Sequence, residues 1–239
     1  MKSDTLKNKR VLITAGPTRE AIDPVRFISN HSSGKMGYAI AETFLQLGAS
    51  VTIVSGPVCL QLKHPNLNIV HVNTAAEMYL ACCQYFETTD VAVFAAAVAD
   101  YRPERVAVQK IKKYEDSFTI KMVKNTDIAY EFGRIKANKQ VAVGFALETN
   151  DELSNAIGKL NKKNFDMVVL NSTNDADAGF GYDTNKITII KRDFGVAEFP
   201  LKSKKEVAKD IVAVTADCLM DNLKELETEN VFDYECMYR

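Results

Sequence analysis

The chain has 239 residues, of which 46% are hydrophobic and 26% are charged, and its formal net charge is −1. This length and composition are those of a globular protein with one substantial core, and the balanced charge excludes a global field that would recruit nucleic acid. No apolar run reaches the length of a membrane span, and we expect no signal peptide in the polar N-terminus. The five cysteines show no C-x-x-C spacing. That argues against a disulfide framework or a zinc site and predicts reduced thiols in the cytoplasm.

Short apolar runs alternate with helical patterns along most of the chain. Residues 11–14 are predicted to form a buried strand, a helix begins after Gly34 and ends near Gly48, and residues 51–54 form the next strand. Strand, helix and strand in this order predict a right-handed crossover in a parallel sheet. Further strands are expected at 67–72, 91–99, 141–147, 165–171 and 186–191, and helices at 75–86, 151–163 and 204–227.

The alternation predicts one α/β domain over residues 1–239, with an open, mainly parallel sheet flanked by helices. The polar, acidic end of the chain, from about residue 228 to 239, is expected to fray.

One lysine-rich segment, at about residues 105–124, breaks the alternation. Residues 106–112 and 118–123 are predicted to form an antiparallel hairpin with a turn at 114–117. Lys110 and Lys112 fall on one face of the first strand, and Ile111 falls on the other. The pattern fits an arm for dimerisation, and it fits equally an edge hairpin whose lysines oppose aggregation.

A long polar loop separates the first strand from the first helix. Dinucleotide-binding units make this connection with a tight G-x-G-x-x-G turn, whereas here about twenty residues intervene. A loop of this length in a compact domain is typically functional or disordered. A Walker P-loop is rejected, because its pattern would need glycine at Ser29 and serine or threonine at Met36.

The end of this loop has the composition of an anion site. Ser32 or Ser33 is expected to cap the following helix, and the N–H groups of its first turn, with Lys35 beside them, would attract an anion. Serines in this place are usually caps alone. Asn30 and Arg26 in the same loop favour phosphate binding.

Small residues follow the predicted strand at 91–99. Ala95 and Ala96 would let a ligand approach the backbone at the carboxyl end of the sheet, although helix packing alone also explains them. Asp100, just beyond, is placed to accept hydrogen bonds from a ribose hydroxyl or a base amine.

Two further positions carry weaker signals. Asp127 and the residues before it form a helix N-cap pattern, whose amides either bind an anion or are merely capped. Lys159 and Lys163 share one helical face and would ordinarily be surface charges, like the lysines at 110 and 112.

Together these segments resemble the bacterial, CTP-dependent type of phosphopantothenate–cysteine ligase (phosphopantothenoylcysteine synthetase). The resemblance spans roughly residues 10–195 and rests, in chain order, on ITAGPTREAIDPVRFISNHSSGKMG, AAAVADYRP, KIKK, TIKMVKNTDI, GFALETN and the Lys159/Lys163 pair. It implies a Rossmann-like fold and a two-step reaction. The carboxylate of 4′-phosphopantothenate attacks the α-phosphate of CTP and releases pyrophosphate. The amino group of L-cysteine then captures the acyl-cytidylate and releases CMP.

The resemblance also implies roles for residues. Asn30 would hold the activated acyl group with Arg26 supporting the loop, and Lys110 would join them in catalysis. The loop that carries the substrate phosphate would comprise Ser32, Ser33, Gly34 and Lys35. The nucleotide site would comprise Ala95, Ala96, Asp100, Lys110, Thr126, Asp127, Ile128, Ala129, Phe145, Lys159 and Lys163.

The implied cofactor is Mg²⁺, carried on the CTP triphosphate through water and phosphate oxygens rather than by protein ligands. The implied assembly is a cytoplasmic homodimer whose arm reaches the neighbouring protomer, with no nucleic-acid or membrane partner. Because ten residues precede Val11, we expect a stand-alone synthetase without flavin. Two positions depart from the family pattern, with Thr126 in place of a frequent proline and Leu147 in place of a frequent alanine.

Two alternatives predict different residues. An NAD(P)-dependent Rossmann-type reductase requires the glycine fingerprint and an acidic residue closing the second strand, where this chain has Ser55. A non-catalytic nucleotide-binding module would be expected to lose Asn30 or the lysines, and all of them are present.

Overall fold

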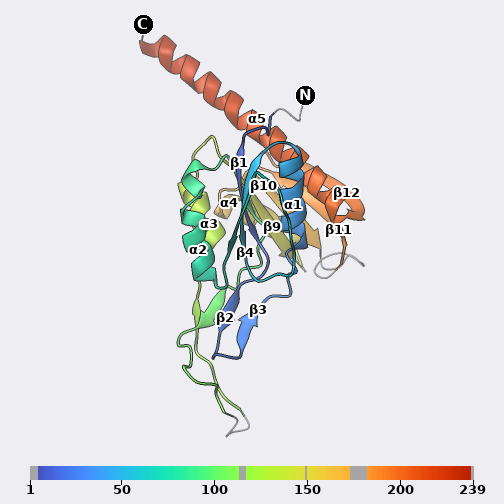
Figure 1. Cartoon of the computed structure of the whole chain (residues 1–239). Coiled ribbons are helices and arrows are strands. Elements are labelled where there is room, and N and C mark those ends of the chain that lie inside the picture. Colours follow the sequence, from blue (N-terminus) through green and yellow to red (C-terminus); the bar gives the residue numbers. More distant parts are fainter. Residues whose placement is uncertain (1–4, 113–116, 149, 173–181, 238–239) are drawn as a thin grey trace.

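The computed structural model describes residues 5–112, 117–148, 150–172 and 182–237; for Ser172 and for residues 226–237 it describes the backbone alone. An eight-stranded sheet lies between two layers of helices (Figure 1). The strand order is β12-β11-β10-β9-β6-β1-β4-β5. Six strands are parallel: β1 (Arg10–Ala15), β4 (Ser50–Ser55), β5 (Leu67–His71), β6 (Val91–Phe94), β9 (Val141–Glu148) and β10 (Met167–Ser172).

Two antiparallel strands, β11 (Thr184–Lys191) and β12 (Val196–Ser203), extend one edge of the sheet. The helices are α1 (Lys35–Gln46), α2 (Ala75–Cys83), α3 (Ile128–Ile135), α4 (Glu152–Lys162) and α5 (Lys204–Met237), with a short 3-10 turn η1 (Phe86–Thr88). The predicted fold class is confirmed. None of the helices that the structure describes is both long enough and apolar enough to cross a membrane.

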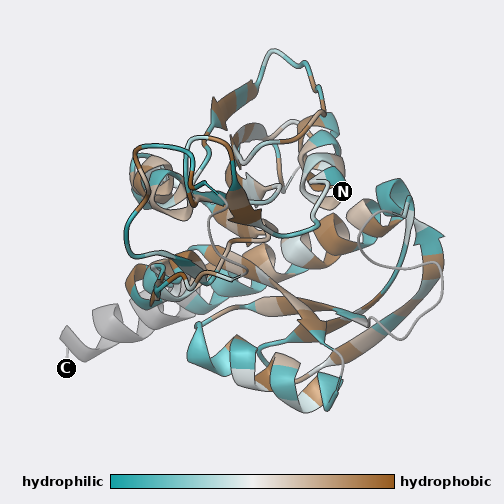
Figure 2. Ribbon diagram, turned by 90° about the horizontal axis from the view of Figure 1, so that it is seen from below, coloured by the Kyte–Doolittle hydropathy of each residue, from teal (hydrophilic) through white to brown (hydrophobic). Residues whose placement is uncertain are grey.

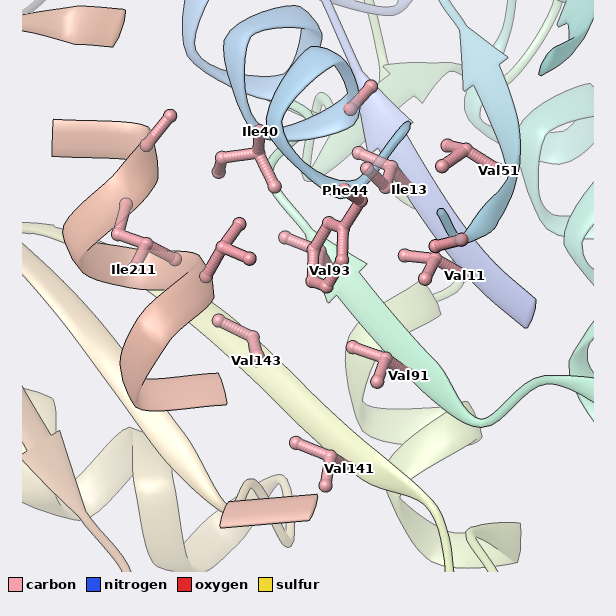
Figure 3. Close-up of a cluster of buried hydrophobic side chains, with 14 of the residues drawn as sticks. Val11, Ile13, Ile40, Phe44, Val51, Val91, Val93, Val141, Val143 and Ile211 are labelled. Atoms are coloured by element: carbon pink, nitrogen blue, oxygen red, sulfur yellow. The ribbon is translucent and has the colours of Figure 1, made fainter. Parts of the chain in front are cut away.

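The core has two halves, one on each face of the sheet. Alternate residues of a strand point to opposite faces, so Val11 and Ile13 of β1 face α1 and α5, whereas Leu12 faces the layer of α2, α3 and α4. Figure 3 shows the first half, where Phe44 of α1 and Ile211 of α5 meet valines from four parallel strands.

The order of the strands places a crevice at the centre of the sheet. From β1 the chain crosses to β4 and β5 on one side, then returns to β6 on the other side of β1. The connections that leave the carboxyl ends of β1 and β6 therefore run in opposite directions. In open α/β sheets, ligands bind at this point.

The structure differs from the sequence expectations in several elements. The strand at 91–99 ends at Phe94, and the polar loop after β1 contains a small hairpin of β2 (Arg19–Ala21) and β3 (Phe27–Ser29). The edge strand β12 was missed because it is largely exposed and has no apolar run. α5 continues to Met237, past residue 228, where the chain was expected to fray.

The arm is present, but its strands are not those predicted. The antiparallel ladder joins β7 (Tyr101–Pro103) to β8 (Met122–Lys124), at the base of the arm. The described residues at 106–112 and 117–121 form no strand, and the predicted turn at 114–117 lies outside the described residues except for Ser117. The described part of the arm extends beyond the carboxyl edge of the sheet, beside β2 and β3 (Figure 1).

Candidate functional site

A cavity of about 460 Å³ opens at the carboxyl edge of the sheet, the side from which Figure 2 is viewed. Its lining comes from the ends of β1, β6, β9 and β10, the starts of α1, α3, β11 and α5, and one face of α4. It lies at the crevice that the strand order creates.

Backbone hydrogen bonds join the loops that follow β1 and β6 and form one wall. Ala97 N–H donates to the carbonyl of Gly16 at 2.9 Å, and the Thr14 hydroxyl accepts from Ala96 N–H at 3.3 Å. The side-chain amide of Asn30 donates to the Ala97 carbonyl at 3.0 Å. Asn30 is therefore held against the alanine segment that follows β6.

The start of α1 lies against β1 at the same wall. Its N-cap is Gly34, in the left-handed region at φ 76, and the serines predicted to cap the helix do not do so. Instead, the Ser32 hydroxyl accepts from Gly34 N–H at 3.3 Å. A Cβ at Gly37 would lie 2.8 Å from the Cβ of Ala15. This helix start approaches β1 closely because Gly37 has no side chain.

Asn125 fixes the segment around Asp100. Its backbone N–H donates to the Asp100 carbonyl at 2.8 Å, and its side chain donates to the Ala99 carbonyl at 2.8 Å. Arg102 donates in turn to the Asn125 side chain at 3.0 Å. Asp100 itself is exposed at the rim of the cavity.

Two lysines, Lys159 of α4 and Lys163 directly after its end, complete this end of the cavity. Asp127 caps α3 as predicted, accepting from Tyr130 N–H at 3.1 Å, and the same oxygen accepts from Lys163 at 2.8 Å. Lys159 donates to the Phe145 carbonyl at 3.3 Å and lies 3.5 Å from the carboxylate of Glu148. Lys159 and Lys163, which were predicted to lie on the same face of a helix, thus both line the cavity.

The opposite end, near the start of α5, carries two more lysines. Lys35 pairs with Asp183 at 2.6 Å, and this contact lowers the pKa of Asp183. Lys204, a buried residue, donates to the Tyr182 carbonyl at 2.6 Å. Burial lowers the pKa of Lys204, and the nearby charge of Lys35 lowers it further, against an opposing effect of Asp183.

A pair of amides lies between these ends. The Asn185 side chain donates to the Asn171 side chain at 3.0 Å, and Asn185 is only 2% exposed. Among the described residues no group donates to its buried Oδ1, and Asn185 lines the cavity. Buried polar atoms without a partner are uncommon, so Asn185 is a candidate contact for a ligand.

The cavity brings together almost all of the residues that the sequence singled out. It is lined by Asn30, Ser32, Ser33, Gly34, Lys35, Ala95, Ala96, Asp100, Thr126, Asp127, Ile128, Ala129, Phe145, Lys159 and Lys163. It does not include Arg26, whose partners are Asp23 and Ile111, or Lys110, which is exposed on the arm. Sequence reasoning missed Asn171, Asn185 and Lys204, and it named Asn125 only as part of the N-cap pattern before residue 128.

Within the described residues, no cluster of three or more His, Cys, Asp or Glu side chains could hold a metal ion. Cys59, Cys82, Cys83 and Cys218 are free thiols. Burial raises the pKa of both Cys82 and Cys218 to about 12, so these two are poor nucleophiles at neutral pH.

Comparison with curated proteins identifies relatives that are longer than this chain. It is 50% identical over 207 residues to a cysteine/cysteine sulfinic acid decarboxylase of an unknown prokaryotic organism. It is 48% identical over 209 residues to the coenzyme A biosynthesis bifunctional protein CoaBC of Vibrio vulnificus (strain YJ016). Each alignment covers 87% of this chain but only 58% and 52% of the two relatives. The chain therefore spans about half the length of the curated relatives it matches.

Solved structures show the same fold. The crystal structure of the C-terminal domain of CoaBC superposes with a TM-score of 0.78 at 43% identity, covering 91% of this chain and 99% of that domain. A Cab2 mutant in complex with phosphopantothenate-cysteine shares the fold, with a TM-score of 0.70 at 17% identity and 92% coverage of both chains. The model of the DFP family, the DNA/pantothenate metabolism flavoprotein C-terminal domain, matches residues 6–219. The chain belongs to this family.

Proposed function

We propose that this protein is a phosphopantothenate–cysteine ligase of coenzyme A biosynthesis, which uses CTP and forms an acyl-cytidylate. One observation carries the proposal: a single cavity places Asn30 and the start of α1 beside Asp100, the start of α3 and the lysines of α4. The same cavity is therefore lined by an amide that can orient the acyl group, a carboxylate that can accept hydrogen bonds from the ribose, and cations that can bind phosphate. The 43% identity to the C-terminal domain of CoaBC supports this assignment.

The two ends of the cavity suit different parts of the reactants. Ala95 and Ala96 leave room for a nucleoside against the backbone, and the exposed carboxylate of Asp100 accepts hydrogen bonds from its ribose. Lys159 and Lys163 bind the nucleotide from the α4 side. The N–H groups at the start of α1, with residues 32–35, receive phosphate oxygens.

The reaction then needs positioning more than acid–base groups. A carboxylate oxygen of phosphopantothenate bonds to the α-phosphorus of CTP as the bond to the β-phosphate breaks, and pyrophosphate leaves. The cysteine amine next attacks the acyl carbon, loses a proton, and CMP leaves with the carboxylate oxygen. Asn30 orients the acyl group, and lysine and backbone N–H groups stabilise the charge that develops on phosphate.

Of the carboxylates that line the cavity, Asp127 is already bound to Lys163, and Asp100 is placed for the ribose. Since the described residues offer no acidic cluster, Mg²⁺ is expected to arrive on the triphosphate, held by phosphate oxygens and water. It would neutralise phosphate charge during the first step. The free thiols fit a reducing cytoplasm.

The arm supports a homodimer. Val106, Val108 and Phe118 on the arm are 54%, 91% and 56% exposed, and Val25 and Phe27 of the neighbouring hairpin are 60% and 48% exposed. These exposed apolar side chains lie on two segments that hydrogen-bond to each other, and we take them as the interaction site. Because Lys110 does not line the cavity of its own chain, we propose that it serves the cavity of the partner. Analytical ultracentrifugation should then give twice the monomer mass.

The test of the function is pyrophosphate release measured with each reactant omitted in turn. Release should require CTP, phosphopantothenate and cysteine together for sustained turnover, and ATP should replace CTP poorly. A folded dimer that releases no pyrophosphate from CTP under these conditions would overturn the proposal. Asn30→Asp should block or stall the acyl-cytidylate, whereas unchanged turnover would remove Asn30 from the mechanism.

A further inference from the structure

Asp23 lies at the tip of the β2–β3 hairpin and is 2% exposed, which is unusual for a carboxylate. The guanidinium of Arg26 holds its pKa well below the usual range, with further help from backbone N–H groups and against the opposing effect of burial. The carboxylate is therefore ionised at neutral pH. Neither Asp23 nor its partners line the cavity, so the reaction does not explain this arrangement.

The two carboxylate oxygens of Asp23 accept hydrogen bonds from different groups. Oδ1 accepts from the backbone N–H groups of Val25 and Arg26, both at 2.9 Å, and so closes the hairpin turn. Oδ2 accepts from Arg26 Nε at 3.0 Å, from Arg26 Nη2, and from the backbone N–H of Ile111 at 3.1 Å. The second oxygen thus joins the hairpin to Ile111 of the arm, a residue 88 positions further along the chain.

Arg26 also binds the backbone of Ile111. Its Nη2 donates to the carbonyl of Ile111 at 3.2 Å, so both backbone groups of Ile111 are held by one ion pair. The Arg26 guanidinium also lies 5.7 Å from the ring centroid of Phe118, on the returning half of the arm. Ala107 N–H adds a bond of 3.0 Å to the Ile22 carbonyl of the hairpin.

The base of the same hairpin is fixed to the body of the protein and leads into the cavity. The buried carboxylate of Glu20 accepts from Ala75 N–H at the start of α2 at 2.9 Å, and Ser29 donates to the Thr18 carbonyl at 2.8 Å. Asn30, the next residue, is held on Ala97 in the cavity wall. A short, anchored hairpin therefore connects the cavity to the arm.

We propose that Asp23 is a positioning residue: through Arg26 and Ile111 it locks the arm to the hairpin and so sets where Lys110 lies. Lys110 is the residue directly before the clamped Ile111. The consequence for catalysis rests on the proposed function, in which Lys110 serves the cavity of the partner. The clamp itself is independent of any ligand.

Asp23→Asn tests the clamp with little other change. The asparagine keeps one acceptor oxygen for the turn, while its NH2 group replaces the oxygen that receives Ile111 and Arg26. Trypsin cleavage of the Lys110–Ile111 bond, followed by mass spectrometry without ligands, reports release of the arm. Cleavage should become roughly tenfold faster or more, because a charge-assisted clamp must otherwise open first.

Two controls make the result specific. Cleavage after Lys139, an exposed residue far along the chain, should not change in Asp23→Asn. Glu104→Gln removes an exposed ion pair of the arm with Lys121 and should leave the Lys110–Ile111 rate unchanged. Equal cleavage of wild type and Asp23→Asn would overturn the proposal, as would equal acceleration at Lys139.

If Asp23→Asn does not fold, Arg26→Lys tests the clamp, and its cleavage rates at Lys110–Ile111 and after Lys139 are compared with those of the wild type. The lysine keeps the positive charge but lacks the planar guanidinium that bonds to the Ile111 carbonyl. Selective acceleration in that variant supports the clamp, and unchanged cleavage overturns it.

The functional consequence has its own readout. Asp23→Asn should lower kcat/KM, and adding it to Lys110→Ala should lower kcat/KM no further, since both changes act through Lys110. Additive losses would overturn the positioning role. Absence of ligase activity in the wild type would instead contradict the proposed function and leave the proteolysis result standing.

Discussion

The glycine at position 144 is a sensitive point behind the cavity, because it packs against Phe165, a residue that lines the cavity. Gly144 lies in β9, opposite the ring of Phe165, which is 2% exposed and lines the cavity. A Cβ added at Gly144 would lie 2.1, 2.4 and 2.7 Å from three atoms of that ring. Carbon atoms in contact are separated by about 3.5–4.0 Å, so the ring would have to move by roughly 1 Å.

Gly144→Ala should therefore destabilise the protein. Contacts this short place the cost in the upper part of the overpacking range, about 2–3 kcal/mol, and replacing a strand glycine regains about 0.5–1 kcal/mol, which leaves a net loss of about 1–2.5 kcal/mol. For a domain of this size that corresponds to a fall in Tm of about 2–10 °C. Urea denaturation with far-UV circular dichroism measures the loss. The KM for nucleotide should also rise, because the displaced ring disturbs Phe94, whose ring centroid lies 5.9 Å away in the cavity wall.

A double-mutant cycle and a control isolate the cause. In a Phe165→Leu background the ring is absent, so Gly144→Ala should cost less than half as much as it does in the wild type. Gly158→Ala places a Cβ in open space on α4 and should stabilise by about 0.5–1 kcal/mol, as in other helices. Additive effects of Gly144→Ala and Phe165→Leu would refute the steric reasoning.

Two other predictions concern buried charges. Lys136→Met removes the ammonium that lies 2.9 Å from Asp166, with both side chains about 95% buried. Arg192 remains 3.6 Å from the same carboxylate, so the loss measured in urea denaturation should lie near the lower end of about 3–5 kcal/mol. Lys121→Met, which removes an exposed ion pair, should cost about 0–1 kcal/mol, and an equal loss in both would contradict the burial argument. Lys204 lies near Lys35, at the end of the cavity assigned to the substrate phosphate. Because burial lowers the pKa of Lys204, it loses its proton at a lower pH than an ordinary lysine, and the KM for 4′-phosphopantothenate should begin to rise there. Lys204→Arg stays charged and should remove this alkaline rise, whereas exposed Lys205→Arg should not; identical pH profiles in wild type and Lys204→Arg would exclude Lys204 from phosphate binding.

The parallel part of the fold was predictable because buried parallel strands are continuous apolar runs with turn residues at their ends. The same logic brought Ala95 and Asp100 to the carboxyl edge, since the carboxyl ends of parallel strands share that edge. Asp127 was predicted only as a helix cap, and its place in the site came from the family resemblance. The start of α1 was placed correctly, but its cap is Gly34, because a serine pattern does not reveal a left-handed backbone.

Residues that depend on long-range packing could not be predicted. Asn185 and Lys204 reach the cavity only because β11 turns back antiparallel to β10 and α5 starts where β12 ends. Asp23 reads as an ordinary turn residue, and its contact with Ile111 crosses 88 positions of the chain. Lys110 was expected in the nucleotide site on the basis of the family resemblance, and within one chain it lies on the arm instead.

Transfer of an isotopic label tests the central claim most directly. With ¹⁸O in the carboxylate of 4′-phosphopantothenate, attack on the α-phosphate of CTP followed by capture with cysteine must leave one labelled oxygen in CMP. Mass spectrometry of the nucleotide product should find one ¹⁸O per CMP formed, with pyrophosphate unlabelled. Unlabelled CMP, or label in phosphate with CDP as the nucleotide product, would contradict the acyl-cytidylate and with it the assigned chemistry of the cavity.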